Sequence, residues 1–317
     1  MASFAIKTTN LSKNFGSIQA LDDLSIEVPS GSVFGFLGPN GAGKTTTIRL
    51  LLGLLEPTHG SGSVLGFDTV NQADQIRSHS GALLEHNGLY ERLSAEDNLE
   101  FYGRVWRIPA TERQARIKEL LVNLDLWERR KELVVNWSRG MKQKLAMARA
   151  LFHRPALLFL DEPTAGLDPS AAARLRDDLE KLVEIEGVTV FLNTHNLTEA
   201  ERLCQQIGII RHGQLVTKGS PSQLRAQIGH PQLEVTGRGI NSDVLQLLRD
   251  RTEVLSANHH NNHLMIKLRE PTETSQLVSL LVNSGVEVDE VIKSQSSLEE
   301  VFLSLVNEDM APGDNHD

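Results

Sequence analysis

The stretch Gly38-Pro39-Asn40-Gly41-Ala42-Gly43-Lys44-Thr45-Thr46 decides the fold of this chain. It follows the apolar run Val33–Leu37 and precedes a segment of helical character that extends to about Leu55, before Pro57. A strand, a glycine-rich loop and a helix in this order are the context that a Walker A phosphate-binding loop requires. The sequence therefore predicts a P-loop at the start of an α/β domain. The alternative is a glycine-rich turn without a ligand.

The chemistry of this loop follows from its residue types. Glycine permits backbone conformations in which several N–H groups point toward bound phosphates, and the helix N-terminus adds partial positive charge. We expect Lys44 to contact the β- and γ-phosphates of a nucleotide and the Thr45 hydroxyl to bind Mg²⁺.

The composition is that of an ordinary globular protein. The chain has 317 residues, of which 40% are hydrophobic and 23% charged, with a net charge of -9. This length favours one large domain with a smaller one, and the acidic balance disfavours a nucleic-acid binder with a general basic surface. Apolar stretches such as Ile48–Leu55 are too short to span a membrane, the N-terminus lacks the features of a secretory signal, and the single Cys204 excludes an intrachain disulfide. We therefore expect a cytosolic protein that reaches a membrane only through a partner.

Apolar spacing predicts alternating strands and helices in the first part of the chain. Short strands are expected at 4–9 and 24–28, separated by turn-rich sequence. Further along, strands at 156–160 and 188–193 enclose a helix at 170–184. The remaining features are a helical region at about 91–151 and a hairpin of 207–211 with 215–218. Apolar strands that alternate with helices indicate a parallel sheet buried on both faces.

A second unit is predicted from 230 to 306. Its element order is strand, helix, strand, strand, helix, strand, helix, which is a ferredoxin-like α+β order with an added helix. The polar, acidic tail 307–317 is expected to be disordered. The predicted fold is therefore an α/β P-loop domain over 1–229, with a mixed sheet and a helical subdomain at about 91–151, followed by a small α+β domain.

Two carboxylates follow the apolar strand that ends at Leu160. Ligands of open α/β sheets bind at the carboxyl ends of the strands, so Asp161 and Glu162 should face the phosphate loop. Asp161 could hold Mg²⁺, directly or through water, and Glu162 could act as the general base toward the attacking water. Without the upstream loop, a solvated strand end would be an equally good interpretation of this pair. His195 follows another apolar strand and could donate a hydrogen bond to the γ-phosphate, although a histidine there is more often a loop residue.

With these motifs the chain resembles ABC ATPases over about residues 4–225. Phe15 has the position of an adenine-stacking aromatic residue, and Glu85 has the Q-loop position. The signature motif is Trp137-Ser138-Arg139-Gly140-Met141, and the D-loop Ala165-Gly166-Leu167-Asp168 follows the acidic pair, before His195 as the switch histidine. Many NTPases share the phosphate loop, whereas the signature followed by the acidic pair is specific to ABC proteins.

The chain departs from the family pattern at three positions. The signature usually reads LSGGQ, so Arg139 replaces a glycine while Ser138 and Gly140 are kept. Glu85 stands where glutamine is usual, and Phe15 where tyrosine is usual. We expect catalysis to survive, with Glu85 as a further candidate ligand for Mg²⁺ that also repels phosphate.

The resemblance implies ATP and Mg²⁺ as cofactors, and two nucleotide sites in a head-to-tail homodimer or a dimer with a paralogous ATPase. Each site would combine the phosphate loop, Asp161, Glu162 and His195 of one subunit with Ser138, Arg139, Gly140 and Met141 of the other. Further similarity to the ATPase subunits of ABC-2 type exporters lies in 88–90, 138–143 and 297–302. This implies a separate polytopic membrane permease, a peripheral position on the cytoplasmic face of the membrane, and no nucleic-acid partner.

Two alternatives belong to other classes of function. A soluble ABC ATPase that acts on ribosomes or nucleic acid usually has two cassettes or a long coiled-coil insertion, and the sequence has neither. A non-transport ATP-sensing module is disfavoured because Lys44, Asp161, Glu162 and His195 are all present. A cluster of apolar and aromatic residues is expected to line the groove for a short helix of the permease, or else to pack inside the helical subdomain, namely Tyr90, Leu93, Phe101, Tyr102 and Trp106. Packing is favoured for Leu93 and Trp106, and exposure for Tyr90.

Overall fold

The computed structural model describes residues 4–85, 87–270 and 272–307, so residues 308–317 of the predicted disordered tail lie outside the described residues. The chain forms two compact units that divide between Lys218 and Gly219. The sequence placed this boundary at 230. The difference arises because α8 (Pro221–Ile228) packs on the last helix, α11 (Leu298–Asn307), within the second unit.

The first unit is built on a six-stranded sheet in the order β11-β10-β4-β9-β8-β7. Neighbouring strands from β10 to β7 pair in parallel. Every residue of β4 and β9 is buried, which explains why these strands are continuous apolar runs rather than alternating ones. The strand bounds are β4 (Val33–Leu37), β7 (Ser80–Leu83), β8 (Leu157–Asp161), β9 (Thr189–Asn193), β10 (Gln206–Arg211) and β11 (Gln214–Gly219).

An antiparallel sheet of the order β2-β1-β5-β6, with β3 paired to β1, forms a second layer of this unit. The expectation of two short strands separated by turn-rich sequence was wrong, because β1 continues to Phe15 and pairs there with Ile18 of β2. The sequence of β2 contains two adjacent aspartates, a residue type that strands disfavour, and its apolar and polar residues do not alternate, so it carries no clear strand pattern. The bounds are β1 (Phe4–Phe15), β2 (Ile18–Leu24), β3 (Glu27–Pro29), β5 (His59–Val64) and β6 (Phe67–Asp68).

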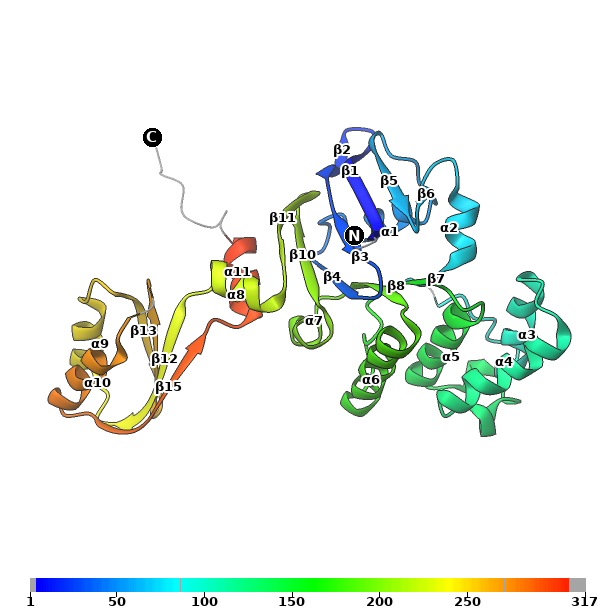
Figure 1. Cartoon of the computed structure of the whole chain (residues 1–317). Coiled ribbons are helices and arrows are strands. Elements are labelled where there is room, and N and C mark those ends of the chain that lie inside the picture. Colours follow the sequence, from blue (N-terminus) through cyan, green and yellow to red (C-terminus); the bar gives the residue numbers. More distant parts are fainter. Residues whose placement is uncertain (1–3, 86, 271, 308–317) are drawn as a thin grey trace. The chain divides into compact units, whose positions relative to one another are not determined.

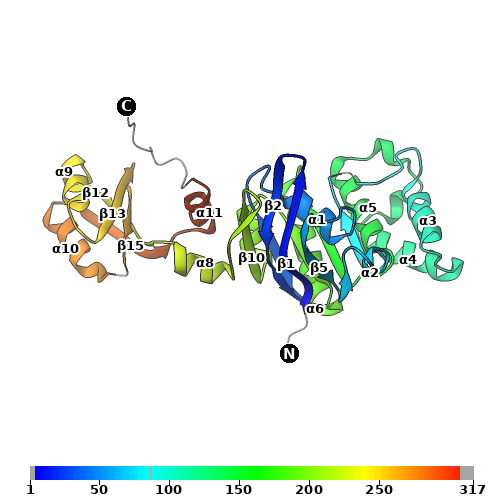
Figure 2. The same ribbon diagram turned by 90° about the horizontal axis from the view of Figure 1, so that it is seen from above.

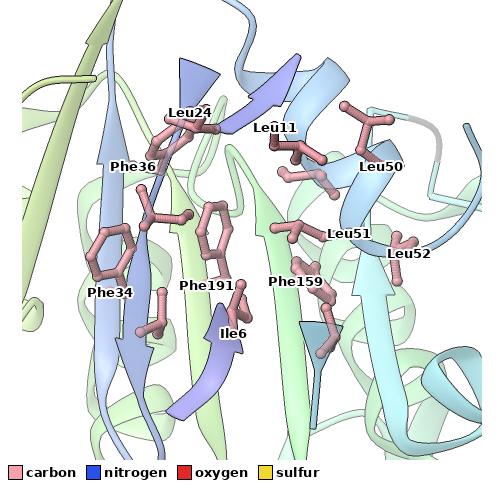
Figure 3. Close-up of a cluster of buried hydrophobic side chains, with 14 of the residues drawn as sticks. Ile6, Leu11, Leu24, Phe34, Phe36, Leu50, Leu51, Leu52, Phe159 and Phe191 are labelled. Carbon is pink, nitrogen blue, oxygen red and sulfur yellow. The ribbon is translucent and has the colours of Figure 1, made fainter. Parts of the chain in front are cut away.

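The main core of the first unit joins the two sheets to α1 (Lys44–Leu51) (Figure 3). Phe191 lies at its centre, with its ring 5.6 Å from that of Phe34, 5.3 Å from that of Phe36 and 5.7 Å from that of Phe159. All four rings are fully buried, and each such burial stabilises the fold by about 1.5–3 kcal/mol. This core therefore fixes the strands whose ends carry the site.

Cys204 packs beside the same sheet and is buried. A Cβ on Gly35 of β4 would lie 2.8 Å from the Cys204 sulfur, so the sulfur occupies the space that the missing side chain leaves. Burial raises the pKa of this thiol well above its usual range.

Helices cover the parallel sheet and form the predicted helical subdomain (Figure 1). The subdomain contains α3, α4 and α5, and the buried Arg116 of α4 donates to the carbonyl oxygen of Leu151 at the end of α5, at 2.8 Å. Among the described residues, no helix is both long enough and apolar enough to cross a membrane. The helices of this unit are α2 (Ala73–His79), α3 (Ala95–Val105), α4 (Ala110–Asn123), α5 (Arg139–Leu151), α6 (Pro169–Glu186) and α7 (Leu197–Leu203).

The second unit has the ferredoxin-like order that the sequence predicts. Its sheet runs β13-β14-β12-β15 with antiparallel pairs, and α9 and α10 lie on one side of it (Figures 1 and 2). Glu300 of α11 accepts from Gln232 of β12 at 2.5 Å and pairs with Lys267 of β14 at 2.7 Å, which ties the added helix to the sheet. The bounds are β12 (Pro231–Arg238), α9 (Ser242–Arg249), β13 (Val254–His260), β14 (His263–Leu268), α10 (Thr274–Asn283) and β15 (Glu287–Gln295).

Candidate nucleotide site

A cavity of about 510 Å³ lies at the carboxyl ends of β4 and β8, where the fold is expected to bind its ligand. It brings together the phosphate loop, the acidic pair and one residue each from the Q-loop and signature positions. The D-loop residue Ala165 and Gln143 also line it, together with three residues that the sequence did not single out, namely Ala20, Leu84 and Asn193. The predicted residues that line it are Asn40, Gly41, Gly43, Lys44, Thr45, Thr46, Glu85, Arg139, Asp161 and Glu162.

The phosphate loop connects β4 directly to α1. Gly43, whose φ is 106°, directly precedes Lys44, the first residue of α1. A Cβ on Gly43 would lie 2.6 Å from the carbonyl oxygen of Ala20. Only glycine fits this conformation without strain, which is why the loop can turn so tightly. Gly38 and Ala42 are buried behind the loop and Pro39 is half-buried, so these three support the cradle rather than line it.

The side chain of Lys44 folds back over the loop. Its ammonium group donates to the carbonyl oxygens of Gly38 at 2.7 Å and Pro39 at 3.0 Å. Burial lowers the pKa of Lys44, while the nearby Glu162 and Asp161 oppose that shift. A charged lysine that is 8% exposed at this loop is suited to bind phosphate oxygens.

Asp161, the last residue of β8, faces the first turn of α1. Its Oδ2 accepts from the Thr45 hydroxyl at 3.4 Å, and its Oδ1 accepts a short hydrogen bond from the Asn193 amide. Burial is the largest cause of a raised pKa at Asp161, with the Asn193 hydrogen bond acting in the opposite direction. A hydroxyl and a carboxylate that face each other form a hard-oxygen donor pair of the kind that Mg²⁺ prefers.

Glu162 adopts a left-handed backbone conformation, with φ of 54°, directly after β8. Its N–H donates to the carbonyl oxygen of Asn193 at 2.8 Å, and its side chain pairs with Nδ1 of His195. A non-glycine residue in this region is strained, and such strain is often found at functional sites. The structure therefore brings the predicted base and the predicted switch histidine into direct contact.

A residue that the sequence analysis missed, Glu199, joins the two loops that carry Glu162 and His195. It is 1% exposed, and one oxygen of its carboxylate accepts from Thr164 at 2.9 Å and from Thr194 at 3.0 Å. Burial raises its pKa, and the two hydroxyl donors oppose that shift. The spacing of four residues after His195 was the available sequence signal, but it also fits an ordinary helix residue.

The signature segment begins α5. Ser138 caps the helix by accepting from the N–H of Met141 at 3.3 Å, and Gln143 donates to the carbonyl oxygen of Pro163 at 2.8 Å. Arg139 lines the cavity, whereas Ser138, Gly140 and Met141 lie outside its lining. This chain alone therefore does not bring the whole signature segment to its own phosphate loop.

Glu85 and Phe15 differ in their relation to the cavity. Glu85 lines it, on the segment after β7. Phe15 lies outside the lining, is 47% exposed, and has the Lys13 ammonium 5.3 Å from its ring. Phe15 belongs to the same β1–β2 hairpin as Ala20, which does line the cavity. That Phe15 contacts the adenine ring stays a prediction.

The fold and the cavity define a P-loop ATPase unit, and comparison with known proteins identifies its class. Residues 21–165 match the ABC transporter family, and residues 219–306 match the C-terminal domain of DrrA1-3-like ATP-binding proteins. The bacitracin transport ATP-binding protein BcrA of Bacillus licheniformis is 36% identical over 95% of this chain and 97% of its own length. The daunorubicin resistance ATP-binding protein DrrA3 of Streptomyces coeruleorubidus is 36% identical over 98% of both chains. The Nod factor export ATP-binding protein I of Cupriavidus metallidurans is 35% identical over 96% of this chain and 98% of its own length.

Solved structures agree with this assignment. An ATP-binding subunit of an ABC transporter is 31% identical with a TM-score of 0.65, over 71% of this chain and 93% of that one. A dimeric post-hydrolysis state of the ATP-binding cassette MJ0796, bound to ADP and Pi, is 26% identical with a TM-score of 0.62, over 68% of this chain and 98% of that one.

The chain belongs to the ABC transporter family, as an ATP-binding and ATP-hydrolysing subunit of the ABC-2 exporter type. Subunits of this kind dimerise and act with membrane components. The alternative of a soluble ATPase directed at ribosomes or nucleic acid finds no support among these relatives.

Proposed function

We propose that this chain hydrolyses MgATP in the cavity at the ends of β4 and β8, and so powers export through a separate polytopic permease. The observation that carries the proposal is the convergence of Lys44, Asp161 and Glu162 on one cavity. Lys44 binds the β- and γ-phosphates, Glu162 takes a proton from the attacking water, and His195 orients Glu162 and donates toward the γ-phosphate. The backbone of the phosphate loop, 38–46, encloses the phosphates, and Phe15 stacks on the adenine.

The donor set of the cavity fits a magnesium ion. Thr45 and Asp161 already face each other at 3.4 Å, and both offer oxygen ligands. Glu85, on the same cavity wall, is the candidate for a further oxygen ligand. Bound Mg²⁺ would neutralise charge on the phosphates, and the residues of this chain would hold it at the start of α1.

We infer that two chains close head-to-tail around two nucleotides, either as a homodimer or with a paralogous ATPase. Ser138 and Arg139 are exposed, and with Gly140 and Met141 they supply donors for a nucleotide held by the other subunit. A facing set of hydroxyl and backbone N–H donors completes an enclosure that one loop alone leaves open on one side. The dimeric solved relative supports this arrangement.

A groove on the first unit is the proposed docking site for the permease. It has a volume of about 460 Å³, and its wall includes Tyr102, Trp106 and the half-exposed Leu54 and Val105. Trp106 stacks on His153 with the ring centroids 4.1 Å apart, so its ring is both packed and part of the groove wall. Exposed apolar residues at a concave surface are typical of sites that bind a short amphipathic helix. In this arrangement the ATPase lies peripherally on the cytoplasmic face of the membrane, and the permease selects the exported compound.

The experiment that tests the proposal is the substitution Glu162→Gln in the full chain, with Glu184→Gln on the exposed surface of α6 as the control. We expect Glu162→Gln to keep ATP binding and to lower kcat by about a hundredfold or more, because a general base contributes on that scale. The control should hydrolyse ATP like the wild type. A Glu162→Gln variant with the wild-type rate would contradict the proposed site.

A further inference from the structure

An asparagine ends the buried strand β9, at a place where packing alone would favour an apolar residue. Asn193 is 2% exposed, and every other residue of β9 is buried as well. Its register partners on the two neighbouring strands are Phe36 of β4 and Asp161 of β8. Burial of an amide group costs free energy unless its polar atoms find partners. A residue that breaks a local packing rule in this way is expected at a functional site.

Only one of the two polar atoms of this amide is satisfied. Nδ2 of Asn193 donates a short hydrogen bond to Oδ1 of Asp161. Oδ1 of Asn193 is buried and has no hydrogen-bond partner among the described residues. Turning the amide over would make matters worse, because its oxygen would then face a carboxylate oxygen and both atoms are acceptors. The contact that this side chain provides is therefore the hydrogen bond to Asp161.

This hydrogen bond fixes the orientation of the Asp161 carboxylate. One oxygen is held by Asn193, and the other accepts from the Thr45 hydroxyl at 3.4 Å. The torsion that turns an aspartate carboxylate is soft, so a carboxylate without such a partner would adopt many orientations. With Oδ1 held, Oδ2 is directed toward the first turn of α1, where Thr45 lies.

The backbone of Asn193 has a separate contact, with the other residue of the acidic pair. Its carbonyl oxygen accepts from the N–H of Glu162 at 2.8 Å. A substitution at position 193 removes the side-chain contact with Asp161 and leaves a carbonyl oxygen for Glu162. Variants of this residue therefore separate the orientation of Asp161 from the placement of Glu162.

We propose that Asn193 is a positioning residue of the metal site, whose amide N–H holds Asp161 in the orientation that binds Mg²⁺ together with Thr45. The inference rests on the proposed function, in which Thr45 and Asp161 are the magnesium ligands. Asn193 acts through Asp161 and touches neither the nucleotide nor the metal. The amide oxygen without a partner destabilises the fold, and the proposed role explains why an apolar residue does not stand at this position.

The first experiment measures binding and needs no hydrolysis. A non-hydrolysable ATP analogue is titrated by calorimetry into the full chain, wild type and Asn193→Val, once with Mg²⁺ and once with EDTA. We expect the variant to bind the analogue about tenfold to a hundredfold more weakly with Mg²⁺, the range for loss of a residue that orients a metal ligand. With EDTA its affinity should equal that of the wild type, because the phosphate loop is untouched. Unchanged affinity in both conditions, or the same loss in both, would overturn the proposal.

A second variant separates the hydrogen bond from the shape of the side chain. Threonine has nearly the shape of valine but carries a hydroxyl donor. Asn193→Thr should therefore regain part of the Mg²⁺-dependent affinity that Asn193→Val loses. Identical affinities of the two variants with Mg²⁺ would show that a donor at this position does not matter, and would overturn the role of the amide.

The control is a second buried asparagine whose polar atoms are all satisfied. Asn98 of α3 is 0% exposed and lies outside the cavity lining. It accepts from the N–H of Tyr90 at 2.8 Å and donates to the carbonyl oxygens of Tyr90 at 3.0 Å and Ser94 at 2.8 Å. Asn98→Ala should lower the melting temperature more than Asn193→Val does, yet leave the effect of Mg²⁺ on analogue binding unchanged. If Asn98→Ala weakened Mg²⁺-dependent binding as much as Asn193→Val, loss of stability alone would explain the effect and the proposal would be wrong.

The dependence of hydrolysis on Mg²⁺ is the last measurement. In Asn193→Val the Mg²⁺ concentration for half-maximal hydrolysis should rise about tenfold to a hundredfold, whereas kcat at saturating Mg²⁺ should recover most of its wild-type value. A low kcat with an unchanged Mg²⁺ dependence would contradict a role at the metal site. If Mg²⁺ had no effect on analogue binding by the wild type, the proposed magnesium site itself would be wrong. An effect on the wild type that persists in Asn193→Val contradicts only the role of Asn193.

Discussion

Replacing Glu199 by alanine should disturb both the stability of the first unit and the chemistry of the nucleotide site. The carboxylate accepts hydrogen bonds from Thr164 at 2.9 Å and Thr194 at 3.0 Å. Thr164 lies two residues after Glu162, and Thr194 directly precedes His195. Loss of the carboxylate therefore releases both loops that carry Glu162 and His195.

The magnitude follows from burial. Thr194 is 1% exposed and Thr164 is half-buried, so the first hydroxyl loses its acceptor without access to water and the second is partly rehydrated. Each buried polar group left without a partner costs about 1–3 kcal/mol. Part of this loss of stability is offset because the variant no longer has to bury a carboxylate. We expect Glu199→Ala to lower the free energy of unfolding by about 2–4 kcal/mol, whereas Glu199→Gln keeps an acceptor and changes it by about 1 kcal/mol or less.

Chemical denaturation and steady-state kinetics check this expectation together. Glu199→Ala should lower kcat with little change in KM, because the phosphate loop is untouched, and Glu199→Gln should restore most of kcat. Since burial raises the pKa of Glu199, its charged form destabilises the fold at pH values above that raised pKa. As the pH falls through the raised pKa, Glu199 takes up a proton in the folded state before it does so in the unfolded state, and the wild type becomes more stable. Any gain in stability of Glu199→Gln over the wild type should therefore disappear at low pH. A Glu199→Ala variant with wild-type stability and kcat would refute this reasoning.

Two further predictions concern the phosphate loop and the docking groove. Lys44→Ala should weaken ATP binding in a calorimetric titration and abolish hydrolysis, since the phosphates lose their nearest cation, and wild-type affinity would contradict the role of Lys44. Val105→Asp should reduce recovery of the permease in a co-purification while ATP hydrolysis by the isolated chain stays unchanged, because the side chain is 59% exposed and its burial in a partner would desolvate the new charge. Full recovery with Val105→Asp would count against the groove.

Much of the fold could be predicted because it depends on local sequence patterns. The continuous apolar runs of β4, β8 and β9 mark strands buried on both faces, and the loop 38–46 has a spacing that few other structures require. The same reasoning missed the extent of the β1–β2 hairpin. In β2 the pairing with β1 and the core contacts of Leu21 and Leu24 outweigh the low strand propensity of two adjacent aspartates, and such long-range contacts leave no local signal.

The candidate site also contains residues that the sequence predicts and residues that it does not. Asp161 and Glu162 were predictable because strand ends place carboxylates at the ligand edge of the sheet. Glu199 was not, because its role depends on two threonines from different loops that meet only in the folded chain. The contact between Arg139 and Gly166 also joins residues that are far apart in the sequence, so the replacement of the signature glycine was visible but its structural setting was not.

The single cysteine offers a practical way to observe the sheet that carries the site. Cys204 is packed against Gly35, and its thiol stays protonated over the ordinary pH range, so thiol reagents should modify it far more slowly than an exposed cysteine. A cysteine introduced at an exposed position would therefore accept a fluorophore specifically, without removal of the native residue. Slow modification of Cys204 itself would report how often this part of the sheet opens, and bound nucleotide should slow that opening because it stabilises the closed state.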